Sequence, residues 1–341
     1  MNTVDQERQE LRDILLSGNF DFETLAFQVF NFQFHHNALY RSFCQLLNRT
    51  PDHISRAQEI PFLPVRFFKT HSLKTEEWEA QLVFRSSGTT KTHRSQHLVR
   101  DAELYQEIST SIFEQSYGPL SDYTILALLP SYLEQGDSSL VYMVQTFMDR
   151  TTNQDSRFYR FDYDLFRKEF IRTLKNEKKI LLWGVTYALL DLAENYTWKD
   201  VAAEAVRDQR LIVMETGGMK GRRPEMLRDE VHDILSEAFG VQAVHSEYGM
   251  TELLSQCYSK GAGIFGPSSS MRVLAFDVQD PLSYVGDGTT GRCHVIDLAN
   301  LDSCSFIATD DLCRTRGGTF EIIGRMDHSE IRGCNLLYQE E

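Results

Sequence analysis

The sequence has no hydrophobic run of the roughly 20 residues that a helix needs to cross a bilayer. Its first ten residues are polar and lack the basic-then-apolar pattern of a secretory signal peptide. The six cysteines are scattered and form no C-x-x-C pair, which argues against both a disulfide framework and a zinc site. These absences predict a cytoplasmic protein with reduced thiols and no membrane span.

Positive charge is also scarce, because acidic residues outnumber Lys and Arg and give a formal net charge of −14. Binding to nucleic acid requires clustered Lys and Arg, so no nucleic-acid partner is expected, although a local basic pocket for a nucleotide remains compatible with this charge. The sequence has neither a Walker G-x-x-x-x-G-K-[ST] loop nor a G-x-G-x-x-G fingerprint. It also contains no internal repeat and no low-complexity segment.

What is present is an ordinary globular composition in a chain of 341 residues, with 42% hydrophobic residues. Apolar residues at helical spacing predict helices over 5–17 and 21–46. Beyond residue 60, short apolar runs alternate with helical patterns, which predicts an α/β core with a largely parallel sheet. The expected strands are 80–84, 123–129, 179–183, 211–215 and 241–245, and the expected helices are 101–116, 138–149, 164–177, 186–195 and 223–239.

After residue 270 the pattern changes to short strands separated by Gly, Asp and Pro, over 271–276, 292–298, 305–309 and 319–324. This change predicts a separate β-rich lobe. The expected organisation is therefore a helical N-terminal region (1–60), an α/β core (61–270), the β-rich lobe (271–324) and a hinge-like tail (325–341).

Two segments that follow predicted strands carry residues suited to a nucleotide. The segment 84–94, Phe-Arg-Ser-Ser-Gly-Thr-Thr-Lys-Thr-His-Arg, combines a glycine with hydroxyl side chains that can converge on phosphate oxygens. The segment 245–252, His-Ser-Glu-Tyr-Gly-Met-Thr-Glu, offers an aromatic ring, a hydroxyl and a carboxylate that can hold Mg²⁺. Taken alone, the first fits a solvated turn equally well, and the second fits a strand end with a packed tyrosine.

Three further segments are weaker signals by themselves. The glycine-rich turn at 215–223 can bring a planar ring close to the backbone, but it can also be a plain turn before a helix. The carboxylates in Ala-Thr-Asp-Asp-Leu at 308–312 can accept ribose hydroxyls, although paired acids in a loop are usually just solvated. The segment Gly-Arg-Met-Asp at 324–327 is ambiguous without its neighbours.

Together and in their order along the chain, the five segments resemble the serial signature of the adenylate-forming superfamily of acyl-CoA synthetases and adenylation domains, from about residue 60 to the end. Within it, the chain is most similar to the acyl-protein synthetases, the long-chain-fatty-acid–protein ligases of bacterial fatty-acid reductase systems. The lead-in Pro-Phe-Leu-Pro-Val-Arg-Phe-Phe-Lys at 61–69, the block at 245–252 and the closing Ile-Arg-Gly-Cys-Asn-Leu at 331–336 carry this similarity.

The resemblance implies the large N-terminal domain of the adenylate-forming fold, and an enzyme that uses ATP and Mg²⁺ to activate a fatty acid as acyl-AMP. The acyl group would pass to a cysteine of the enzyme for delivery to an acyl reductase. The implied nucleotide-binding residues are Ser86, Ser87, Gly88, Thr89 and Thr90 for the outer phosphates, Gly217 and Gly218 beside adenine, Tyr248 and Gly249 at its ring, and Asp311 with Arg325 at the ribose. The implied catalytic residues are Thr251 at the α-phosphate, Glu252 as the Mg²⁺ ligand and Cys334 as the acyl acceptor.

The sequence departs from the superfamily pattern in its basic residues. Lys91 and Arg94 shift the positive charge of the phosphate loop, and Asp310 replaces the usual glycine before the ribose carboxylate. The expected C-terminal lid, which carries a lysine in relatives, is absent, and Lys69, Lys91 and Lys220 are candidates to replace that lysine. Two alternatives stay open: a free-standing ligase for coenzyme A or a carrier protein, and a non-catalytic nucleotide-binding subunit.

Overall fold

A computed structural model describes residues 3–86, 94–130, 136–219 and 221–326. The chain begins with the helices α1 (Thr3–Ser17), α2 (Phe22–His36) and α3 (Ala38–Leu46). The expectation of one helix over 21–46 is wrong, because Asn37 has an extended backbone with φ −110° and ψ 102°. Its side-chain oxygen accepts a hydrogen bond from the Tyr40 N–H and caps α3, which starts a new helix at this point.

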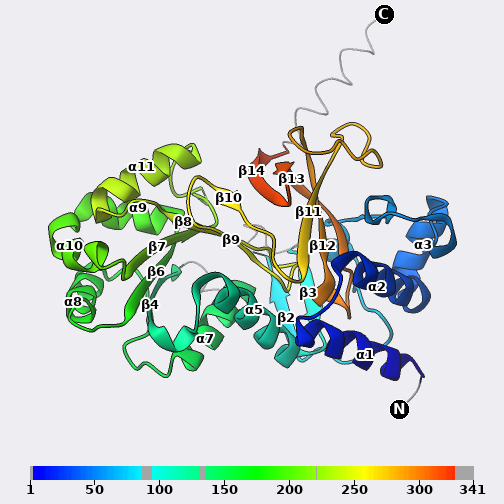
Figure 1. Ribbon diagram of the computed structural model, residues 1–341, viewed down its shortest axis with the longest axis horizontal. Helices are drawn as coiled ribbons and strands as arrows, with labels where there is room; N and C mark the ends of the chain where they lie inside the picture. The colour runs from blue at the N-terminus through cyan, green and yellow to red at the C-terminus, as the bar shows by residue number, and fades with distance from the viewer. Residues whose placement is uncertain (1–2, 87–93, 131–135, 220, 327–341) are drawn as a thin grey trace, which may run out of the picture.

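The parallel half of the large sheet has the spatial order β5 (Arg157–Tyr159), β4 (Tyr123–Leu128), β6 (Lys179–Val185), β7 (Leu211–Thr216) and β8 (His245–Tyr248). Its helices are α5 (Ala102–Tyr117), α7 (Ser139–Thr151), α8 (Tyr163–Thr173), α9 (Thr186–Asn195), α10 (Lys199–Arg207) and α11 (Arg228–Phe239). Figure 1 shows α9 and α11 above the strands and α5 and α7 below them. All of β4 is buried, which explains its continuous apolar run. The α/β prediction is confirmed.

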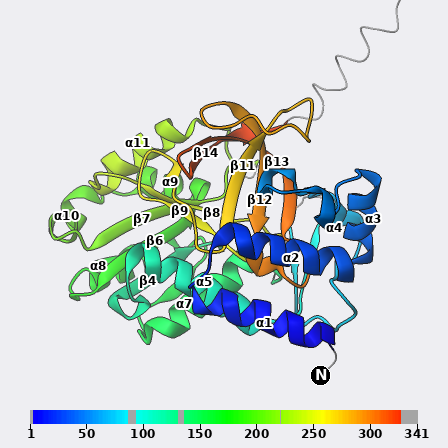
Figure 2. The ribbon, with the colours of Figure 1, turned by 45° about the vertical axis from the view of Figure 1, so that its right-hand side comes forward.

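The antiparallel half continues the same sheet beyond β8 through β9 (Cys257–Ser259), β10 (Ile264–Phe265), β14 (Thr319–Arg325), β13 (Phe306–Arg316), β12 (Thr290–Asp297) and β11 (Met271–Phe276). A short strand, β1 (Leu63–Pro64), pairs with β13 in parallel. The strands after residue 270 are therefore an extension of one sheet and not a sheet of their own (Figure 2). The division into domains stays a prediction.

Three strand predictions near the motifs need correction. The strand expected at 80–84 is β2 (Leu82–Arg85), and it pairs with β3 (Gln96–Val99) in a separate two-stranded antiparallel sheet. The strand expected at 241–245 lies later, because His245 to Glu247 pair with Met214 to Thr216. The strand expected at 305–309 continues to Arg316, so Asp311 lies inside β13 and not in a loop.

The N-terminal helices pack on the turn that follows β12, which includes the 3₁₀ helix η4 (Leu298–Asn300). Gln33 of α2 donates to the carbonyl oxygens of Asn300 (2.9 Å) and Leu301 (3.0 Å) and accepts from the Ser305 N–H (3.0 Å). These bonds satisfy a fully buried amide side chain. The helical region is therefore joined to the sheet through buried polar contacts.

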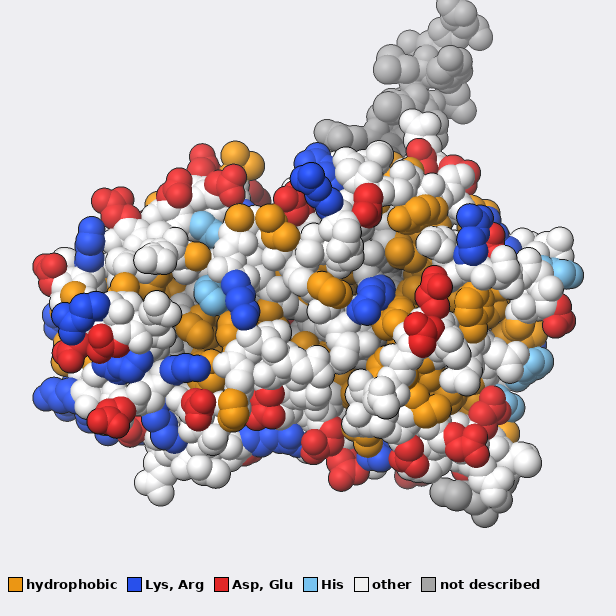
Figure 3. Space-filling view, in the orientation of Figure 1, with side chains coloured by type: hydrophobic (Ala, Val, Ile, Leu, Met, Phe, Trp, Pro, Cys, Tyr) orange, Lys and Arg blue, Asp and Glu red, His pale blue; other side chains and the backbone are white. Residues whose placement is uncertain are grey.

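Two surface properties follow from the described residues. None of their helices combines the length and the apolar character required to span a bilayer. On the face shown in Figure 3, basic and acidic side chains are interspersed, and no continuous basic area forms there.

Candidate active site

The hydroxyl-rich loop starts where β2 ends, and its two stems are held together. The Ser86 N–H donates to the Ser95 carbonyl oxygen (3.1 Å), and the Ser95 N–H donates to Ser86 Oγ (3.0 Å). Arg94 Nη2 donates to Asp137 Oδ1 at 2.8 Å, so this basic residue is engaged in the stem. Ser87, Gly88, Thr89, Thr90 and Lys91 lie outside the described residues, as do Lys220 and Cys334.

Tyr248, Asp311 and Arg325 meet where β8, β13 and β14 come together. The Tyr248 hydroxyl donates to Asp311 Oδ2 (3.1 Å), and Arg325 Nε donates to Asp311 Oδ1 (3.2 Å). Burial raises the pKa of Asp311, and the charge of Arg325 opposes this rise. A carboxylate has about four lone-pair sites, so Asp311 retains capacity to accept hydroxyl groups from a ligand.

The ring of Tyr248 is buried and makes edge contacts with Phe265 and Phe320, with centroid distances of 5.9 and 5.6 Å. The aromatic neighbours and the bond to Asp311 therefore fix the position of this ring. Its predicted stacking on adenine stays a prediction.

Glu252 is a buried carboxylate four residues after Tyr248. Burial raises its pKa, while a hydrogen bond with Ser95 and the charges of Arg325 and Lys69 lower it. Ser95 belongs to the stem of the hydroxyl-rich loop, and Lys69 lies on the short helix α4 (Phe67–Thr70). The charge of Arg325 thus lowers the pKa of two carboxylates. These are Asp311, the predicted ribose ligand, and Glu252, the predicted Mg²⁺ ligand.

The glycine-rich turn follows β7. Gly217 has φ +76°, a conformation that favours glycine, and its carbonyl oxygen accepts from Thr186 Oγ1 at 3.3 Å. A Cβ at Gly218 would meet no atom within 4 Å, so open space borders this residue. The space suits the predicted contact with adenine, which stays a prediction.

Glu247 is a buried carboxylate that the sequence pattern did not single out. It accepts a hydrogen bond from Thr216 Oγ1, and burial raises its pKa to about 7. A Cβ at Gly249 would overlap Glu247 Oε1, so a larger residue at that position would have to displace the Glu247 carboxylate. The burial of Glu247 depends on the neighbouring strands, so the sequence does not reveal it. The one signal for this residue in the sequence is its place inside the 245–252 block.

We expect Glu247→Gln to stabilise the protein at neutral and alkaline pH. The folded state binds the Glu247 proton more tightly than the unfolded chain, so the free energy of unfolding falls as the pH rises from about 4.5 to about 7. Glutamine keeps the acceptor for Thr216 and removes this loss, which amounts to about 3 kcal/mol for a pKa raised from 4.5 to about 7. Urea unfolding at about pH 5 and about pH 8 measures the difference.

The matched control is Glu237→Gln, because Glu237 is exposed on α11. It should change the stability equally little at both pH values. A Glu247→Gln protein whose advantage over the parent does not grow between the two pH values would contradict the prediction.

The described residues suit a magnesium ion that binds together with the phosphates of a nucleotide better than a metal ion held by protein ligands alone. In the described ranges, no group of three or more His, Cys, Asp or Glu side chains is placed to hold a metal ion. Mg²⁺ commonly binds one or two carboxylates together with substrate phosphates and water. Glu252, with the Ser95 hydroxyl beside it, supplies a donor set of that kind.

Comparison with known proteins gives the family directly. The sequence model described as acyl-protein synthetase, LuxE, matches residues 137–341, which is more than half of the chain. The matched range contains Tyr248, Glu252, Asp311, Arg325 and Cys334. A search of curated proteins found no match.

Solved structures of adenylate-forming ligases share the fold. The open conformation of 2-hydroxyisobutyryl-CoA ligase with 2-HIB-AMP and CoA has a TM-score of 0.58 and 16% identity, covering 89% of this chain and 73% of that chain. ATP-bound MatB from Rhodopseudomonas palustris has a TM-score of 0.53 and 12% identity, covering 94% and 72%.

An ATP-bound chimera, RpMatB-BxBclM B3, has a TM-score of 0.53 and 15% identity, covering 84% of this chain and 56% of that chain. The chain thus spans little more than half the length of this chimera. At these identities the likeness establishes the fold alone, whereas the sequence match establishes the family: the chain belongs to the acyl-protein synthetases, LuxE.

Proposed function

We propose that this protein uses ATP to activate a carboxylic acid as its acyl-adenylate and then transfers the acyl group to Cys334 as a thioester. The observation that carries the proposal is the meeting of Tyr248 and Arg325 on the Asp311 carboxylate, with the charge of Arg325 also lowering the pKa of Glu252. Membership of the family supports a long-chain fatty acid as substrate and an acyl reductase as the protein that receives the acyl group. A cytoplasmic location stays a prediction.

In the first step, a carboxylate oxygen of the acid attacks the α-phosphorus of ATP. A new P–O bond forms, the bond to the β-phosphate breaks, and pyrophosphate leaves. The protein contributes by holding the reactants in line and by neutralising charge. Asp311 would accept the ribose hydroxyls, Thr251 would donate to the α-phosphate, and the loop that starts at Ser86 would bind the outer phosphates.

Glu252 is the residue that would hold magnesium. When bound there, the ion would neutralise the charge on the phosphates and orient them for displacement. The positive charges of Arg325 and Lys69 both lower the pKa of Glu252, so both side chains would add positive charge beside the magnesium position.

In the second step, the Cys334 thiolate attacks the acyl carbonyl carbon. The C–S bond forms, the C–O bond to AMP breaks, and the thiol proton is released to solvent. Thiolate is the reactive form of cysteine, and Arg332 nearby in the sequence favours it. A thioester retains the reactivity of the acyl group, which a reductase requires.

A second candidate function is a ligase that delivers the acyl group to coenzyme A. The similarity to a structure that contains an acyl-adenylate and CoA favours this alternative. The two functions differ in where the acyl group goes after the first step.

Intact-mass spectrometry after incubation with ATP, Mg²⁺ and a panel of carboxylic acids tests the proposal. The proposed function requires an acyl adduct on the polypeptide that hydroxylamine removes. Formation of acyl-CoA without an adduct would favour the alternative, and absence of acid-dependent exchange of pyrophosphate into ATP would exclude both.

Of the three lysines predicted to serve the adenylation step, Lys69 lies within the described residues. We expect Lys69→Ala to slow pyrophosphate exchange roughly tenfold, less than the 10²–10³-fold cost of an enclosed donor, because Lys69 is exposed. Its charge acts on Glu252, so Lys69→Arg should retain most of the rate.

The control is Lys175→Ala, which removes an exposed lysine two residues after the end of α8 and should leave the exchange rate unchanged. If Lys69→Ala exchanges as fast as this control, another cation serves the site.

A further inference from the structure

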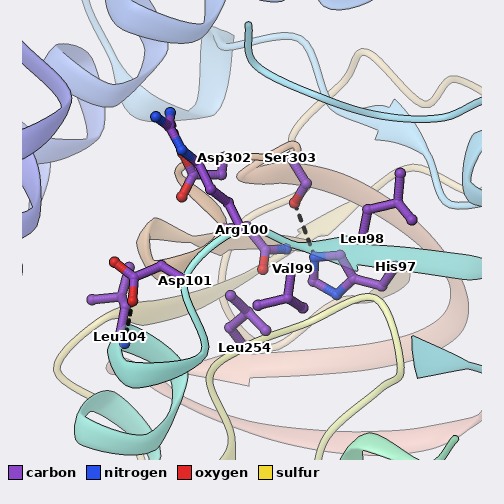
Figure 4. Close-up of a pocket in the computed structure, with 10 residues that line it drawn as sticks. His97, Leu98, Val99, Arg100, Asp101, Leu104, Leu254, Asp302 and Ser303 are labelled. Carbon is purple, nitrogen blue, oxygen red and sulfur yellow. Dashed lines mark hydrogen bonds and ion pairs between the residues drawn. The ribbon is translucent and has the colours of Figure 1, made fainter. Parts of the chain in front are cut away.

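His97 lines a small pocket and connects two segments that are far apart in the sequence. Its Nδ1 is 2.9 Å from the Thr251 carbonyl oxygen, and its Nε2 is 3.0 Å from Ser303 Oγ. Figure 4 shows the Ser303 side chain directed at the imidazole ring. The residue is 1% exposed, and burial lowers its pKa to about 4, so the ring is neutral.

These two partners determine which nitrogen carries the proton. A carbonyl oxygen can only accept, so Nδ1 must be the protonated nitrogen that donates to Thr251. Nε2 is then unprotonated and accepts from the Ser303 hydroxyl. The geometry therefore requires the Nδ1–H tautomer of His97.

The Ser303 side of this connection is firmly held. The Ser303 carbonyl oxygen accepts hydrogen bonds from Asn37 Nδ2 (2.9 Å) and Thr75 Oγ1 (3.1 Å), and both donors are buried. The neighbouring Asp302 pairs with Arg8 of α1. The position of His97 is thus set by the N-terminal helical region and the turn after β12.

The other side of the connection reaches the proposed catalytic residues. Besides the bond to Thr251, the ring of His97 makes an edge contact with Phe68, at a centroid distance of 5.5 Å, on the helix that carries Lys69. Ser95, which bonds to Glu252, lies two residues before His97 and is likewise buried. His97 therefore contacts the residue before Glu252 and the residue before Lys69.

We propose that His97 is a positioning residue of the adenylation site, whose Nδ1–H holds the Thr251–Glu252 segment in place for the nucleotide and its metal. The expected effect on Mg-ATP binding rests on the proposed function. The expected tautomer and its hydrogen bond to Thr251 rest on the geometry alone. The competing explanation is that His97 is a buried residue that stabilises the fold alone. The two differ in whether loss of the Thr251 bond changes the binding of Mg-ATP.

The first measurement is the ¹⁵N NMR spectrum of the parent protein with labelled histidine, which distinguishes the two neutral tautomers. We expect the His97 signals of a ring protonated at Nδ1. A ring protonated at Nε2 would overturn the proposal without any substitution.

The second measurement compares three variants in acid-dependent pyrophosphate exchange. Asparagine places its amide nitrogen near the position of Nδ1, so His97→Asn should keep the KM for Mg-ATP within about twofold. His97→Gln places its amide near Nε2 instead, and His97→Leu has no donor; both leave the Thr251 carbonyl unpaired. For these two we expect the KM to rise about tenfold or more.

The control is His294→Gln, which replaces another buried histidine that packs against Phe62 and Phe276 away from Thr251. It should lower the melting temperature without changing the KM for Mg-ATP. If His97→Gln and His97→Leu behave as this control does, His97 serves the fold alone and the proposal fails.

Failure of the proposed function gives a different result. A parent protein that exchanges no pyrophosphate with any acid would refute the function, and amide hydrogen exchange over residues 249–254 then decides the role of His97. Faster exchange in His97→Gln and His97→Leu than in His97→Asn supports positioning, and equal exchange in all three overturns it.

Discussion

Replacing Glu252 with Gln is expected to lower the rate of acid-dependent pyrophosphate exchange by at least about tenfold, because a charge-assisted contact of a buried group contributes about 1.5–3 kcal/mol. Glu252 is 5% exposed, and its pKa is raised by burial and lowered by Ser95, Arg325 and Lys69. Glutamine has the same size and retains an acceptor for Ser95. The variant therefore removes the charge that magnesium requires and little else.

The stability of this variant serves as an internal check. Burial raises the folded-state pKa of Glu252, so ionisation of this group costs stability once the pH exceeds its value in the unfolded chain. The neutral glutamine should fold at least as stably as the parent at neutral pH. Glu237→Gln is the exposed control, and a well-folded Glu252→Gln protein with the exchange rate of that control would refute the metal-binding role.

A Cys334→Ser variant is expected to lose the acyl adduct completely while it still exchanges pyrophosphate. The five other cysteines are buried, and burial raises the pKa of Cys44 and Cys304 to about 12. All five thiols are enclosed, and those of Cys44 and Cys304 also remain protonated, which makes them poor nucleophiles. Intact-mass spectrometry with a hydroxylamine step measures the adduct.

The control for this experiment is Cys304→Ala, which removes a buried thiol and should leave the adduct in place in the folded protein. A Cys334→Ser protein labelled as fully as the parent would show that the acyl group resides elsewhere. Loss of both labelling and exchange would instead indicate a defect in the first step.

Much of the parallel half of the sheet was predictable from the sequence. The strands β4, β6 and β7 are buried on both faces, so each forms a short continuous run of apolar residues, and amphipathic helices separate them. Short strands such as β9 and β10 were missed, because two or three residues carry no measurable periodicity. The pairing of β2 with β3 was missed for another reason: the pattern of a strand does not reveal its partner.

The candidate site was predictable in part. The order of the motifs indicated Tyr248, Asp311 and Arg325, and the structure brings these three side chains together, although their roles in nucleotide binding stay predictions. Glu247 and His97 were not indicated, because each belongs to a common residue type at an unremarkable position. Their importance arises from burial and from partners on other strands.

The alternation of strands and helices and the serial order of the motifs can be read from the chain, since both depend on residue types close together in it. The meeting of distant residues cannot be read in this way: Thr251 and Ser303 bond to the two nitrogens of His97, and Arg8 pairs with Asp302, 294 positions apart. Such contacts follow from how the N-terminal helices and the turn after β12 pack on the sheet. They depend on shape and burial, which no local pattern of residues encodes.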